Sequence, residues 1–177
     1  MTGVLSRGLV VAALITVLAV PAAAAGSATG PTGSGYLVVR KAISDGGVNG
    51  NPVVTVVVLG FVLGRVSQEG EVDVYRLPPA SAPQVNGADI SARSVRWHRL
   101  PGERYSGSNF RFSATSGRGL YRVVVRGSGI YIFAGGRGTV WLQGSSINRR
   151  ADGTYSVNGS AFRSMPTHLL KRQIGRG

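Results

Sequence analysis

From residue 36 onward, apolar and polar positions alternate in short runs, and glycine, proline, asparagine and serine separate one run from the next. A period of two in runs rich in β-branched and aromatic residues is typical of half-buried β-strands. After the first 25 residues, only 167–173 shows a trace of helical periodicity. We therefore expect strands at 36–41, 53–59, 61–66, 71–77, 94–99, 109–114, 120–126, 130–133, 139–143 and 154–157.

Short alternating strands of this kind predict an all-β fold, with one inward face on each strand. We expect a single antiparallel β-sandwich or flattened barrel of about eight to ten short strands. The run 53–63 is nearly all apolar. It is interpreted as a strand that is buried on both faces and is bent or broken at Gly60.

Two tight hairpins are expected within this fold. A loop at 68–70 would place Arg65 opposite Asp73 as an ion pair, with a glycine available for the turn. A second loop, between the strands that carry Tyr131 and Trp141, would place those two rings opposite each other. Both faces of the second hairpin would be apolar.

The first 25 residues have a pattern of their own. Arg7 precedes the apolar run 8–20, and a proline and four alanines follow it. This arrangement is typical of a secretory signal peptide with cleavage after Ala24 or Ala25. The run is shorter than the roughly 20 residues that a membrane-spanning helix needs. The alternative is an uncleaved anchor. We expect a secreted or cell-envelope-associated protein without a transmembrane segment after cleavage.

The remaining chain is expected to be one domain. After the signal peptide at 1–25, the segment 26–35 is rich in glycine, serine and threonine and is expected to be a flexible lead-in. The all-β domain would span 36–163, and 164–177 would be a basic C-terminal tail.

The amino-acid composition excludes several kinds of reactive and metal-binding site. The chain has no cysteine, which excludes disulfides, thiolate catalysis and thiolate-metal sites, and its two histidines, His98 and His168, lie far apart in sequence. Neither a metal nor a cofactor is expected. The 20 basic and 7 acidic residues give a formal net charge of +13. Such a field attracts polyanions, although a GC-rich coding sequence would produce the same arginine bias.

The basic residues are concentrated at 93–126, where Glu103 is the only acid. If the apolar residues of this segment enter the core, alternation would place its basic side chains together on the opposite face. We expect that face to bind an anionic cell-envelope polymer or an acidic protein surface. Nucleic acid is the weakest candidate because of export, and an ordinary solvated surface is the alternative. The candidate binding residues are Arg96, His98, Arg111, Arg122 and Arg126.

Two other functions remain open from the sequence. Tyr131, Phe133 and Trp141 could form the aromatic patch of a carbohydrate-binding module, although burial in the core is the favoured interpretation. A small secreted hydrolase would need two carboxylates about 5 to 10 Å apart, brought together by the fold. No Gly-x-Ser-x-Gly motif occurs. The sequence therefore favours a non-catalytic protein and leaves its ligand and oligomeric state open.

Three segments carry a resemblance. These are 119–130 (GLYRVVVRGSGI), 138–144 (GTVWLQG) and 152–159 (DGTYSVNG). They resemble segments of small secreted β-rich proteins of actinobacteria that have no known activity. The resemblance spans roughly 54–160 and implies secretion and a β-rich fold, but no functional residues.

Overall fold

The computed structural model describes residues 33–44, 50–145 and 153–175. The expected signal peptide and most of the expected lead-in lie outside these ranges. The described residues confirm the all-β prediction, since every regular element is a strand. Within them, no helix has the length and apolar character to span a membrane. The strands are β1 (Gly35–Ala42), β2 (Val53–Arg76), β3 (Gln84–Asn86), β4 (Ser91–Trp97), β5 (Leu100–Gly127), β6 (Ile130–Gln143), β7 (Thr154–Val157), β8 (Arg163–Ser164) and β9 (Leu170–Ile174).

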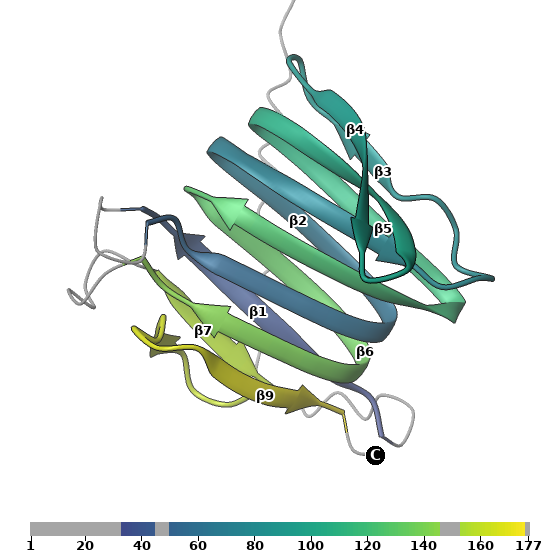
Figure 1. Cartoon of the computed structure of the whole chain (residues 1–177). Coiled ribbons are helices and arrows are strands. Elements are labelled where there is room, and N and C mark those ends of the chain that lie inside the picture. The colour runs from purple at the N-terminus through teal and green to yellow at the C-terminus, as the bar shows by residue number, and fades with distance from the viewer. Residues whose placement is uncertain (1–32, 45–49, 146–152, 176–177) are drawn as a thin grey trace, which may run out of the picture.

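All nine strands belong to one antiparallel sheet. Its main order is β3-β5-β2-β6-β1-β7-β8, with β4 added to β5 and β9 added to β6. The expected sandwich of two sheets or flattened barrel of short strands does not form, because the described strands make one open sheet and β2 and β5 are 24 and 28 residues long. A single sheet can still enclose a core here because its three longest strands, β2, β5 and β6, bend along their length (Figure 1).

The strands β2 and β5 form a two-stranded ribbon that coils back on itself. One register runs from Val53 opposite Arg126 to Tyr75 opposite Gly102, along almost the whole of both strands. A second register pairs Gly70–Arg76 of β2 with Gly127–Tyr121 of β5. Residues 121–126 therefore have β2 on both edges. This double pairing requires that the ribbon turn through a full circle.

The coil has two layers around one core. In β2, residues 53–59 lie in the first layer, 61–66 in the second and 70–76 in the first again, one turn later. The first layer also contains β4, β9 and the segments 101–108, 120–127 and 137–143. The second layer also contains β1, β3, β7 and the segments 110–115 and 130–135.

Residues with positive φ mark several corners between the layers. Gly60 and Gly136 have φ of +154° and +133°, and Asn109 has φ of +49°. At another corner, the backbone N–H of Ser67 donates to the carbonyl of Gly129 at 3.0 Å. The bend expected at Gly60 is thus confirmed, and it carries the strand onward into the other layer.

Alternation along β2 decides what the core contains. The even-numbered valines from Val54 to Val74 are buried, whereas Leu59 and Leu63 on the odd side are exposed. The run 53–63 is therefore not buried on both faces, and that expectation is wrong. Its odd-numbered residues form the outer surface of the coil.

Neither expected hairpin forms. Arg65 lies opposite Arg111 and Tyr131, and Asp73 lies opposite Arg104 instead of Arg65. The strand β6 runs unbroken through the second expected loop. A hairpin turn at either place would make the strand pair with the residues that follow it in the sequence. In the coil, β2 instead pairs with β5 and with β6.

The C-terminal segment is part of the sheet. Residues 170–174, within the segment expected to be a basic tail, form β9, which pairs with residues 138–142 of β6. Ile174 is buried in the core. Its side chain anchors a segment whose charges, on Lys171 and Arg172, face outward.

Candidate functional site

The five predicted binding residues do not form one surface. Arg122 and Arg126 lie on β5 in the first layer, whereas Arg111 lies on β5 in the second layer. Arg96 lies on β4 and lines a hollow beside the core residue Val74. His98 occupies the turn after β4, where its φ is +53°. Arg111 is separated from Arg122 and Arg126 because β5 passes from one layer to the other between residues 115 and 120.

Arg126 belongs to a compact ion-pair cluster on the first layer. Arg104 Nη2 donates to Asp73 Oδ2 at 2.7 Å, and Arg126 Nη1 donates to the same oxygen at 3.0 Å. Both arginines also contact Glu71 at 3.0 Å. Two carboxylates thus neutralise two guanidinium groups, and Asp73 is only 1% exposed.

The cluster gives one carboxyl, that of Asp73, a shifted pKa. Burial alone would raise the pKa of Asp73, but hydrogen bonds and positive charge from Arg104 and Arg126 outweigh it and hold the pKa below its ordinary value of 3.8. A carboxyl with a lowered folded-state pKa stabilises the fold above its unfolded pKa, and this contribution is lost as the pH falls through the folded pKa. We expect stability to decline below about pH 4 and to decline less in Asp73→Asn, as urea denaturation at stepwise lower pH would show. Equal acid loss in both proteins would contradict this.

Arg122 has aromatic partners instead of acidic ones. Its guanidinium carbon lies 4.2 Å from the centre of the Trp97 ring and 5.4 Å from that of Tyr75. The His98 ring packs against Trp97 at 4.8 Å. Burial lowers the pKa of Arg122, and no carboxylate in the described part of the chain forms a salt bridge with it. Two predicted residues, His98 and Arg122, therefore meet at Trp97.

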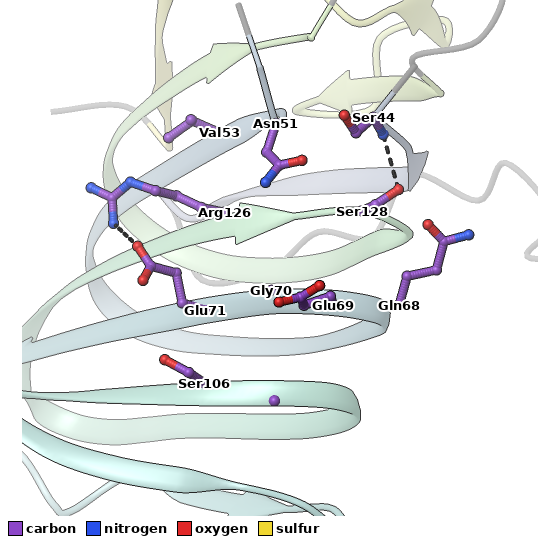
Figure 2. Close-up of a pocket in the computed structure, with 11 residues that line it drawn as sticks. Ser44, Asn51, Val53, Gln68, Glu69, Gly70, Glu71, Ser106, Arg126 and Ser128 are labelled. Atoms are coloured by element: carbon purple, nitrogen blue, oxygen red, sulfur yellow. Dashed lines mark hydrogen bonds and ion pairs between the residues drawn. The ribbon is translucent and has the colours of Figure 1, made fainter. Parts of the chain in front are cut away.

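A hollow of about 860 Å³ lies beside the ion-pair cluster (Figure 2). Glu69 and Glu71 both line it, and a hydrolase would need two such carboxylates facing one substrate. Both oxygens of Glu71 are already occupied, Oε1 by Arg126 and Oε2 by Arg104. Figure 2 shows Glu71 turned toward Arg126 and away from Glu69. Among the described residues that line the hollow, no two carboxylates are therefore both free to act on a substrate.

A second acidic side chain of the described residues, Glu103, is also occupied by a partner. Glu103 accepts a hydrogen bond from the hydroxyl of Tyr105. Burial, together with this bond, raises the pKa of Tyr105 to about 12. Within the described ranges, no three side chains of histidine, aspartate or glutamate come together as a metal site.

The three predicted aromatic residues divide between the layers. Tyr131 and Phe133 are 39% and 45% exposed, so the interpretation that placed them in the core is wrong. Ile130 and Ile132 take the core side of that segment instead. Trp141 lies on the first-layer segment of β6, with Lys171 Nζ 5.8 Å from its ring. Trp141 therefore does not lie beside Tyr131 and Phe133.

Tyr131 and Phe133 belong to an apolar surface on the second layer that the sequence pattern does not reveal. The Phe133 ring lies 5.4 Å from Phe61 and 6.3 Å from Tyr36. Leu63 stands in register with Phe133 and is also exposed. We call this surface the aromatic face; its members are Tyr36, Phe61, Leu63, Tyr131 and Phe133.

Two arginines border the aromatic face. Arg65 on β2 is in register with Tyr131 on one side and with Arg111 on the other. Arg65 Nη2 donates to Asn109 Oδ1 at 2.9 Å, and neither arginine pairs with a carboxylate of the described residues. The second-layer strands and segments contain no aspartate or glutamate. Arg65 was not among the predicted binding residues because the expected hairpin assigned it to Asp73.

No known protein family, curated protein or solved structure matches this chain.

Proposed function

We propose that this is an exported, non-catalytic protein that binds an anionic polymer of the bacterial cell envelope through Arg65 and Arg111. The observation that carries the proposal is the register of these two exposed arginines, directly opposite each other on β2 and β5. Like charges in this position destabilise a sheet. A bound anion would remove that repulsion, and none of the described acidic residues forms a salt bridge with either arginine.

The rest of the charge distribution supports this choice. Arg104 and Arg126 are neutralised by Glu71 and Asp73, so one of the five predicted binding residues, Arg126, has its charge balanced within the protein. Arg65 and Arg111 keep theirs. The overall net charge of +13 attracts a polyanion at long range, and the unneutralised pair then provides short-range contacts. The leader pattern at 1–25 supports export.

Retention on isolated bacterial cell envelopes tests the proposal. The protein should be retained at roughly 0.01 M salt and released progressively toward roughly 0.15 M, because the screening length falls from about 30 Å to about 8 Å. The double variant Arg65→Gln/Arg111→Gln should bind about tenfold or more weakly, since each cation near an anionic surface contributes about 1 kcal/mol.

The matched control is Arg93→Gln/Arg99→Gln. It removes the same charge from two exposed arginines at the β4–β5 hairpin. Equal losses in both double variants would mean that net charge alone drives retention. Full retention of Arg65→Gln/Arg111→Gln would refute the proposal.

A further inference from the structure

We infer that the polymer is an acidic glycan whose sugar rings lie on the aromatic face while its carboxylates or phosphates bind Arg65 and Arg111. This inference rests on the proposed function and specifies its ligand class. It joins two surface features that lie side by side on the second layer: an exposed apolar platform and an unneutralised pair of cations.

The platform is continuous across three strands. Phe133 of β6 lies between Leu63 of β2 and Val38 of β1. In the next row, Gly135 lies between Phe61 and Tyr36. A Cβ on Gly135 would lie only 2.6 Å from the Phe61 ring, which shows that this ring covers the glycine. The absence of a side chain there brings the rings of β1, β2 and β6 together.

Exposure distinguishes this platform from a core. Tyr36, Leu63, Tyr131 and Phe133 are 37–45% exposed, and they are neighbours rather than scattered residues. Contiguous apolar patches on soluble proteins mark interaction sites. The C–H face of a pyranose ring packs on such a surface while its hydroxyl groups stay in water. Half-exposed rings on a sheet suit this mode of contact.

The arginines lie where substituents of a bound chain would reach them. Leu63 and Arg65 point to the same side of β2 and are two residues apart, a separation of roughly 7 Å. Arg65 also stands beside Tyr131. A sugar on Phe133 and Leu63 would therefore place the acidic groups of its neighbour close to Arg65 and Arg111. Guanidinium groups bind carboxylate and phosphate oxygens with two parallel hydrogen bonds.

Three soluble probes separate ring contacts from charge contacts. Polygalacturonate has rings and carboxylates, poly(glycerol phosphate) has charge without rings, and xylan has rings without charge. Isothermal titration at low salt should give the tightest binding with polygalacturonate. Phe133→Leu keeps an apolar side chain but removes the ring, so it should bind polygalacturonate about tenfold more weakly, comparable to the smaller losses seen when an aromatic ring is removed from beneath a nucleobase. Its binding of poly(glycerol phosphate) should not change.

Two further variants complete the test. Arg65→Gln/Arg111→Gln should lose affinity for both anionic probes. Trp97→Leu, which removes an exposed ring from the first layer, should bind all probes as the unmodified protein does. If Phe133→Leu does not fold, as judged by circular dichroism, Tyr36→Leu replaces it.

The outcomes separate the inference from the proposed function. If ring removal leaves polygalacturonate binding unchanged while the arginine variant loses it, the glycan inference is wrong and the proposed function stands. If the arginine variant binds both anionic probes normally, the proposed function itself fails. Failure of the unmodified protein to bind polygalacturonate also overturns the inference. The inference is also wrong if only Trp97→Leu loses affinity for polygalacturonate. It is wrong as well if the protein binds phosphatidylglycerol vesicles more tightly than polygalacturonate.

Discussion

Asp73→Ala should lower the free energy of unfolding by about 3–5 kcal/mol, the cost typical of breaking a buried ion pair from one side. Asp73 is 1% exposed, and its carboxylate accepts hydrogen bonds from both Arg104 and Arg126. Its removal leaves the two guanidinium groups with Glu71 alone. Repulsion between the arginines then opposes the pairing of residues 70–76 of β2 with β5 on both sides. Urea denaturation at pH 7, followed by tryptophan fluorescence, measures the loss.

Glu71→Gln is the control for Asp73→Ala. Glu71 contacts the same two arginines, but its side chain is 26% exposed, so water can replace the lost contacts. A loss of about 1 kcal/mol is expected, as for a partly exposed ion pair. If Asp73→Ala costs no more than Glu71→Gln, the buried carboxylate does not hold the two turns of the ribbon together.

Gly60→Ala should cost about 3 kcal/mol or more, or should prevent folding. Gly60 has φ of +154°, and a Cβ there would lie 2.1 Å from the carbonyl oxygen of Gly135. Because the obstacle is backbone on the paired strand β6, the side chain of a neighbour cannot move to relieve the contact. Thermal and urea unfolding of the variant test this.

The variant Gly50→Ala separates the cost of the steric contact at Gly60 from the cost of a positive φ alone. Gly50 also has a positive φ, +67°, but a Cβ there would have no other atom within 4 Å. The left-handed conformation alone costs a residue with a side chain about 1–2 kcal/mol. A similar loss in both variants would show that the corner at Gly60 accommodates a Cβ by shifting β6.

The strands could be predicted from the sequence because alternation is a local property. The runs at 53–59 and 120–126 lie within β2 and β5, and the bend at Gly60 was expected from its position inside an apolar run. Pairing is not local. Hairpin rules join neighbouring segments, whereas residues 121–126 pair with two parts of β2 that lie one coil turn apart.

The candidate site was harder to predict, because burial and ion pairing both depend on which strands lie side by side. At 130–133 both sides of the strand are apolar, so the sequence does not show that Ile130 and Ile132 are buried while Tyr131 and Phe133 are exposed. Arg65 was assigned to Asp73 because a hairpin was assumed. Arg126 was expected on a free basic face, but its partners Glu71 and Asp73 are brought to it from a strand more than fifty residues earlier.

The coiled ribbon also bears on how this chain reaches its native state. Its second turn cannot close until β5, synthesised well after β2, has entered between the two parts of β2. Proteins dominated by such distant pairings fold slowly, on a scale of roughly milliseconds to seconds. For a chain exported as we propose, this delay is an advantage, because an extended polypeptide passes through a membrane channel more readily than a closed coil.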